Sequence, residues 1–123
     1  MEIIKQGISI DKPDGTHVDY FIFPEYEIHY NELQPRTIQQ WHHHNVIEET
    51  IFVISGKIEI HWQVDKILFS EQVSNGDVIR VENTPHTLMN NTDCCAKFIV
   101  FRFVPTGKDN RELIKNDKHL DII

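Results

Sequence analysis

The sequence has 123 residues, which is enough for one ordinary domain and too short for two. Hydrophobic residues make up 40% and charged residues 25%, a composition typical of folded globular proteins rather than disordered chains. The formal charge of -7 argues against a general nucleic-acid partner or an anionic membrane surface. No apolar run approaches the roughly 20 residues that span a bilayer, and the first ten residues lack the features of a signal peptide, so we expect a cytoplasmic protein.

Short strand-like segments separated by turns occupy most of the chain. The stretch Asp-Lys-Pro-Asp-Gly at residues 11–15 has turn composition, and two strands are predicted within residues 17–30, on either side of Pro24. Further strands are predicted over residues 37–44, 49–54, 57–64, 66–69, 77–81, 87–89 and 96–104. Many short strands with frequent turns predict an all-β fold, a sandwich or a small antiparallel barrel.

The segment 57–64 has the most regular pattern of the chain. Its residues Ile58, Ile60, Trp62 and Val64 alternate with polar residues, which predicts a half-buried strand with the apolar set facing inward. Together with the apolar run 49–54, it is expected to form a hairpin that turns at Gly56.

The C-terminal part of the chain differs in pattern. Segment 96–104 is apolar on both faces, which is typical of a sheet interior or an oligomer contact. After Pro105, Asp109 is expected to cap a short helix through about Lys115, with Leu113 and Ile114 as its apolar contacts. The apolar end at residues 120–123 is expected to dock on another surface, and with segment 96–104 it predicts a homodimer.

The two cysteines, Cys94 and Cys95, are adjacent in the sequence. Neighbouring cysteines bridge each other only with strain, so we interpret them as reduced thiols in or beside a strand. Free thiols also fit a reducing compartment.

Histidine is the unusual residue of this composition, with eight in the chain and three in a row at His42, His43 and His44. On an extended strand, residues two apart point to the same side with Cα atoms roughly 6.5–7 Å apart, so His42 and His44 could share one ion while His43 faces away. Glu49 and His86 are candidates for the remaining ligands. Alone, a His-x-His pair is more often solvated or an ordinary polar pair than a metal site. A three-histidine, one-carboxylate set suits Fe(II), Mn(II), Ni(II), Cu(II) or Zn(II).

Two longer segments that contain these histidines and Glu49 resemble the motifs of a known protein family. WHHHNVIEETIFVISG, residues 41–56, resembles the first motif of the cupin superfamily, and GDVIRVENTPHTLMNN, residues 76–91, resembles the second. The resemblance implies a small antiparallel jelly-roll barrel, to which the residues after Pro105 add the short C-terminal helix predicted above. It implies a single cupin domain over residues 1–123, with a motif-bearing core at about 36–104 and a tail at 105–123. By position, it places metal ligands at His42, His44, Glu49 and His86.

The chain departs from the family pattern at three places. Arg36 stands where a glycine often precedes the first histidine by six residues, and Glu82-Asn83-Thr84 replaces the usual Pro-x-Gly turn before Pro85-His86. Glu48 competes with Glu49 as the carboxylate ligand. The spacing to Gly56 and the shared parity with the apolar residues that follow favour Glu49.

Other residues receive weaker interpretations. Trp41 is expected to pack rather than to stack on a substrate, and His17, His29, His61 and His119 are interpreted as solvated or ordinary hydrogen-bonding histidines. Residues that could line a pocket, if their strands face inward, are Tyr30, Gln40, Arg80, Met89 and Arg102. An inward Arg80 or Arg102 would favour an anionic substrate such as a carboxylate, although a structural ion pair is an equal alternative.

Three functions are compatible with these residues. The first is a small metal-dependent enzyme, a dioxygenase or an isomerase, acting on a small polar molecule at the open positions of the ion. The second is a metal-bearing module that binds or senses a small ligand without turnover. The third is a metal-free sugar-nucleotide epimerase or isomerase on the same barrel. The sequence assigns no catalytic acid or base, and the fold alone does not choose the reaction.

Overall fold

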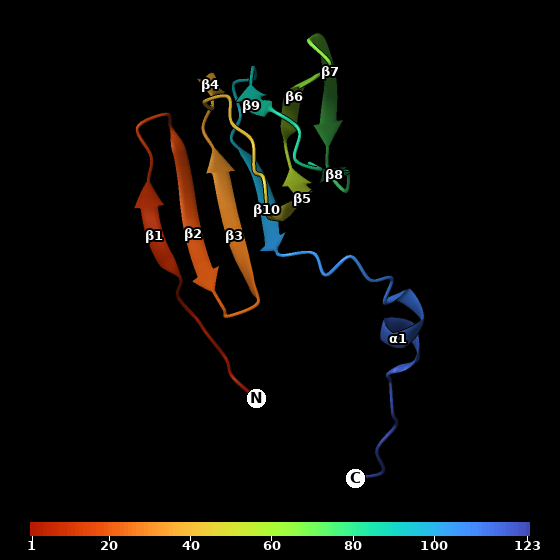
Figure 1. Ribbon diagram of the computed structural model, residues 1–123. Coiled ribbons are helices and arrows are strands. Elements are labelled where there is room, and N and C mark those ends of the chain that lie inside the picture. The colour runs from red at the N-terminus through yellow and green to blue at the C-terminus, as the bar shows by residue number, and fades with distance from the viewer.

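Two antiparallel β-sheets face each other in the computed structural model, which describes residues 1–123 (Figure 1). The six-stranded sheet has the order β1 (Ile8–Asp11), β2 (Thr16–Ile22), β3 (Tyr26–Leu33), β10 (Ala96–Phe103), β5 (Glu48–Ser55) and β8 (Val78–Arg80). The four-stranded sheet has the order β4 (Thr37–Ile38), β9 (His86–Asn90), β6 (Lys57–Val64) and β7 (Ile67–Ser74). The predicted all-β class and the small antiparallel jelly roll are confirmed.

The core lies between the two sheets and is built from residues on alternate positions of the strands. Ile51 and Val53 of β5 face inward from one sheet, and Ile58 and Ile60 of β6 face inward from the other. Trp62 is partly buried and packs against this core, so the predicted alternation of β6 is confirmed over most of its length. Complete burial of each such aliphatic side chain contributes roughly 1.5–3 kcal/mol.

The predicted hairpin between residues 49–54 and 57–64 is wrong. β5 pairs with β10 and β8, while β6 pairs with β7 and β9, so the two segments belong to opposite sheets. Gly56 takes the chain from one sheet to the other with φ +87°, and a Cβ there would lie 2.8 Å from the Cα of Ala96. Alternation tells which side of a strand faces the core, but it does not tell which strand lies beside it.

Two strand predictions differ in length from the structure. Residues 37–44 contain only β4 (Thr37–Ile38) and one isolated bridge from His42 to His86. Conversely, β7 runs from Ile67 to Ser74 rather than ending at residue 69. β7 is an exposed edge strand, so polar residues continue through its second half and hide its length in the sequence.

Strand β10 lies inside the six-stranded sheet, with β3 on one side and β5 on the other. Ala96, Phe98 and Val100 point into the core and are buried, whereas Phe101 and Phe103 on the other face are exposed. The interior position predicted from its apolar character is therefore confirmed. Its outer face is apolar and open to solvent in the single chain.

The C-terminal segment extends away from the sheets and contains α1 (Arg111–Asn116) (Figure 1). The short helix is confirmed, but Asn110 rather than Asp109 is its first flanking residue, and Asp109 accepts a hydrogen bond from the Arg111 amide. The expected contacts of Leu113 and Ile114 are wrong, because these side chains are 70% and 75% exposed. Residues 120–123 are exposed as well. A helix that is both long and apolar enough to cross a membrane does not occur in the structure.

Candidate metal centre

An isolated β-bridge joins His42 and His86, two of the candidate metal ligands. The amide of His42 donates to the carbonyl of His86 at 3.1 Å, and the amide of His86 donates to the carbonyl of His42 at 2.9 Å. The bridge lies at the first residue of β9, at the end opposite its pairing with β4, and brings the two imidazole rings to a centroid distance of 4.4 Å. Residues 44 positions apart in the sequence therefore become neighbours through main-chain hydrogen bonds alone.

Hydrogen bonds on the far side of each ring fix its tautomer. Nδ1 of His42 lies 2.9 Å from the carbonyl oxygen of Gln40, and Nδ1 of His86 lies 2.7 Å from that of Thr84. Since a carbonyl only accepts, each Nδ1 carries the proton and each Nε2 keeps a free lone pair. Metal-binding histidines in proteins are oriented by this kind of second hydrogen bond.

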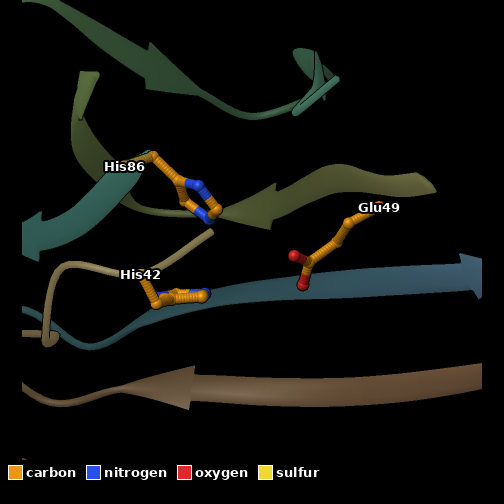
Figure 2. A group of neighbouring side chains, drawn as sticks. All are labelled: His42, Glu49 and His86. Carbon is orange, nitrogen blue, oxygen red and sulfur yellow. The ribbon is translucent and has the colours of Figure 1, made fainter. Parts of the chain in front are cut away.

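Glu49 reaches the two histidines from the opposite sheet. Its side chain points inward from β5 and is 5% exposed, and one ligand atom each from His42, Glu49 and His86 lie within 4.8 Å of one another. Figure 2 shows the two rings and the carboxylate turned toward one another. Glu48 faces away and accepts a hydrogen bond from the amide of Glu82, so Glu49 is the glutamate that the fold places in the site.

His44 also reaches the centre, although it is outside that group of three. Its Nε2 lies 2.8 Å from Oε2 of Glu49, and its ring centroid is 5.2 Å from that of His42. Both the nitrogen and the oxygen are buried and have no polar partner other than each other. Buried polar atoms are rarely left unpaired, and a cation beside them would satisfy both. The donor set thus fits a divalent transition metal, with three imidazoles and one carboxylate.

Burial keeps two of these rings uncharged near neutral pH. Loss of solvent lowers the pKa of His86, and the neighbouring ring of His42 acts in the same direction, while the carbonyl of Thr84 opposes it. Loss of solvent also lowers the pKa of His44, and the Glu49 carboxylate only partly offsets this. Because a metal ion binds the neutral imidazole, the site favours the protonation state that a ligand needs.

The centre opens into a cavity of about 450 Å³ between the sheets. Apolar side chains of Ile51, Leu88, Phe98 and Val100 form part of its wall. Its polar and charged lining includes Arg102, His29, Asn31, Gln39, Lys12 and Asp14. A volume of this size suits a small molecule.

The backbone explains how the chain tolerates its departures from the motifs. Arg36, Glu82 and Asn83 all have positive φ, at 59°, 53° and 59°. Glycine is the usual residue for this left-handed conformation, and other residues adopt it at a cost of roughly 1–2 kcal/mol. The chain keeps the turns that lead to His42 and His86 without the glycines that usually form them.

The pocket residues considered from the sequence divide into two groups. Gln40 and Arg102 line the cavity beside the centre, whereas Tyr30 and Met89 do not, and Arg80 lines a separate cavity. Trp41 is exposed and lines neither cavity, and His43 points to solvent, as expected for the histidine of opposite parity.

His29 is one of several cavity residues that the sequence analysis missed; the others include Lys12, Asp14, Asn31 and Gln39. From the sequence, we interpret His29 as a solvated or ordinary hydrogen-bonding histidine. In the structure it is buried on the inner face of β3 and lines the cavity. Its neighbours Asn31 and Leu33 on alternate positions are buried too, but the apolar residues Ile28 and Tyr30 lie on the opposite face, so the alternation in the sequence does not mark the face of His29 as the inner one.

Two sheets, an inward His-His-Glu group and an adjoining cavity define a cupin-type β-barrel with a candidate metal centre. The chain belongs to the Cupin_2 family, whose model, described as a cupin domain, matches residues 29–102. A comparison with curated proteins finds no match.

Solved structures with the same fold come from proteins of different kinds. The Cupin_2 domain of an XRE family transcriptional regulator from Enterobacter cloacae has a TM-score of 0.60 at 20% identity, covering 73% of this chain and 97% of that one. A sugar phosphate isomerase of the cupin superfamily from Silicibacter pomeroyi has a TM-score of 0.64 at 18% identity, covering 83% and 72%. An oxalate oxidase has a TM-score of 0.66 at 16% identity, covering 76% and 53%. At these identities, the likeness establishes the fold alone.

Proposed function

We propose that this cupin domain holds one divalent transition-metal ion through His42, His44, Glu49 and His86, and that it acts on a small polar molecule beside that ion. The metal is one of Fe, Mn, Ni, Zn and Cu, the ions that a nitrogen-rich set with one carboxylate accepts. When bound, such an ion supplies Lewis-acid chemistry or, if it is redox-active, electron transfer.

One observation carries this proposal. Atoms with free lone pairs converge from both sheets, namely Nε2 of His42 and His86 and the Glu49 carboxylate, while the buried Nε2 of His44 lies 2.8 Å from Oε2 of Glu49 and has no other polar partner. No donor bonds Nε2 of His42 or of His86, and on Glu49 only Oε1 has a donor, in the long contacts of 3.4 and 3.5 Å from Arg102. The arrangement instead leaves acceptors facing one another, which is stable when a cation lies among them.

The reaction class we favour is a metal-dependent dioxygenase or isomerase. The supporting observations are the cavity of about 450 Å³ beside the four side chains and its polar lining, which leave room for a substrate next to the ion. The chain folds like an oxalate oxidase and a sugar phosphate isomerase, and at 16% and 18% identity this likeness supports the scaffold but does not select between the two chemistries.

A second candidate function is ligand binding or sensing without turnover. It is favoured by the similarity to the Cupin_2 domain of a transcriptional regulator. The match covers 97% of that solved domain. In that case the same cavity would hold its ligand unchanged. The metal-free epimerase has weaker support, because the four candidate ligands are all present and converge.

Metal analysis of freshly purified protein, followed by an oxygen-consumption screen, tests the proposal. We expect close to one equivalent of a transition metal per chain, and oxygen uptake with some of the catechols, thiols or keto acids if the protein is a dioxygenase. Metal without turnover of any substrate would favour the sensing function. A protein that folds, lacks metal and gains none on incubation with these ions would contradict the proposed centre.

We also propose that two chains associate through the outer apolar face of the six-stranded sheet, defined here as Phe52, Ile54, Val78, Phe101 and Phe103. All five side chains are exposed in the single chain. They are contiguous, because Phe52 lies opposite Val78 on one side and Ile99 on the other, and Ile99 is two residues from Phe101. Contiguous exposed apolar surface of this kind marks an interface more often than a solvated face.

A cytoplasmic location stays a prediction.

A further inference from the structure

Arg102 is one of two fixed positive charges in the cavity, with Lys12, and it is the one that contacts Glu49 of the candidate metal centre. It lies on β10 directly across from Glu49, and its side chain points inward with 29% exposed. Its inward direction follows from strand parity, since Phe98 and Val100 on the same face are core residues. The sequence alone leaves this open, because both faces of β10 are apolar.

The guanidinium group of Arg102 is incompletely paired. Its only hydrogen bonds run from Nε and Nη2 to the same oxygen, Oε1 of Glu49, at 3.4 and 3.5 Å. Charge-assisted bonds of this type are normally about 2.7–2.9 Å long, so these two are weak. Arginine has five N–H donors in a planar fork that matches a carboxylate, and most of them remain free here.

The surrounding charge favours an anion once the centre holds a metal. The formally charged side chains of the cavity wall are Lys12 and Arg102 against Asp14 and Glu49, and Glu27 lies opposite Arg102 on β3, so the charge around the cavity is slightly negative without an ion. A divalent cation would make the net charge of the cavity positive. It would also attract the Glu49 carboxylate, which weakens the ion pair between Glu49 and Arg102. His29 lies close to Arg102 but cannot offset the positive charge of the cavity, because a histidine side chain carries no negative charge.

The apolar wall and the amide side chains around Arg102 fit the rest of such a ligand. Ile51, Leu88 and Phe98 offer a surface for a carbon skeleton, and Asn31 and Gln39 offer hydrogen bonds to hydroxyl or carbonyl groups. We propose that the ligand of this cavity is a small organic acid, that Arg102 binds its carboxylate, and that this residue sets the preference for acids over neutral analogues. This inference rests on the proposed function, since the metal provides the excess positive charge.

The test compares acids with their neutral amides at equal shape. Manganese-loaded protein is titrated in a calorimeter with lactate and mandelate, and then with lactamide and mandelamide, which keep the hydroxyl and carbonyl oxygens but lose the charge. We expect at least one acid to bind about tenfold or more tightly than its amide. Equal affinities within both pairs, or no binding of either acid at millimolar concentration, would overturn the proposal.

Variants of Arg102 assign that preference to the residue. Arg102→Gln should lower the preference for the acid about fivefold or more, to the level that the ion alone provides, while keeping one equivalent of manganese, and Arg102→Lys should recover part of it because it restores the charge without the fork. Arg80→Gln is the matched control, because this exposed arginine lies outside the cavity, and it should bind acids like the wild type. Thermal melts check that each variant is folded.

Two further outcomes separate this inference from the proposed metal function. Loss of manganese from Arg102→Gln would show that Arg102 positions Glu49 instead of binding a ligand, and would overturn the inference while leaving the metal centre intact in the wild type. If the wild type binds no metal, the proposed function fails. In that case the same titrations are made on the metal-free protein. A preference for the acid over its amide that is lost in Arg102→Gln would support the role of Arg102, and the absence of such a preference would overturn it.

Discussion

At the scale of single residues, His44 is the candidate ligand that depends most on one contact. Its unpaired Nε2 faces Oε2 of Glu49 at 2.8 Å. His44→Ala should lower bound metal from about one equivalent to well below it, with an affinity loss exceeding the 10–100-fold typical of changing a residue that only hydrogen-bonds to a metal ligand. Elemental analysis after gel filtration measures this.

The neighbouring residue supplies the control for that variant. His43 is exposed and its side chain is outside the centre, so His43→Ala should keep the metal content of the wild type. Full occupancy in His44→Ala, or an equal loss in both variants, would refute the assignment of His44 as a ligand.

The buried histidines predict how the metal-free protein responds to pH. Burial lowers the pKa of His29, His44 and His86, so below their usual value of about 6.5 the unfolded chain binds more protons than the folded one. The free energy of unfolding should therefore be highest above pH 6.5 and fall as the pH drops from there toward the lowered values. Urea denaturation between about pH 7.5 and 5 measures this trend.

Single substitutions identify the source of the pH effect. His29→Gln should weaken the pH dependence, whereas His119→Gln should leave it unchanged because His119 is fully accessible in the tail. A stability that rises on acidification from pH 7 to 6 would contradict the burial of neutral histidines.

The first motif places three of the candidate ligands close together in the sequence. His42 and His44 lie two apart, and Glu49 is distinguished from Glu48 by parity along β5, which the structure bears out in the direction of the two side chains. Arg102 and His29 were harder to place. Their roles depend on which face of β10 and β3 turns inward, and that is decided by packing between distant segments.

At the scale of elements, the turn between β6 and β7 carries backbone strain. Val64 pairs with Ile67, so Asp65 and Lys66 form a two-residue hairpin loop, with φ of 51° and 65°. Such loops favour glycine at the second position. Lys66→Gly should raise the free energy of unfolding by about 0.5–1 kcal/mol, the relief of left-handed strain less the entropy that glycine adds to the unfolded chain.

A second variant at the same position isolates the backbone effect. Lys66→Ala removes the same exposed side chain but keeps a Cβ, so its stability should stay close to that of the wild type. The strain account is refuted if Lys66→Gly is less stable than Lys66→Ala in urea denaturation.

Element by element, the sequence predicts strands better than their partners. The inward sets of β5 and β6 are apparent from their apolar residues, but their assignment to opposite sheets depends on pairing with β10 and β9, far away in the chain. The polar second half of β7 was missed for a related reason. An edge strand has little apolar signal because much of it faces water.

At the scale of the whole molecule, the outer apolar face predicts assembly. Phe101 lies on the third strand from one edge of the six-stranded sheet and is 40% exposed. We expect light scattering at micromolar concentration to give twice the mass of one chain, and Phe101→Asp to shift this mass to that of the monomer, since it buries an unpaired charge in the interface.

The other sheet supplies the matched control for assembly. Ile67 on β7 is 58% exposed and lies outside the outer apolar face, so Ile67→Asp should stay dimeric. A wild-type protein of monomeric mass, or a dimer that Ile67→Asp dissociates while Phe101→Asp does not, would contradict this interface.

The central claim is that side chains from both sheets meet around one metal ion, and crystallography with anomalous scattering tests it most directly. Crystals of protein loaded with cobalt should show a single strong anomalous peak about 2.0–2.2 Å from Nε2 of His42, Nε2 of His86 and a carboxylate oxygen of Glu49, with Nε2 of His44 as the fourth protein ligand. The absence of a peak there in loaded crystals, or a peak bound only by other residues, would contradict the account.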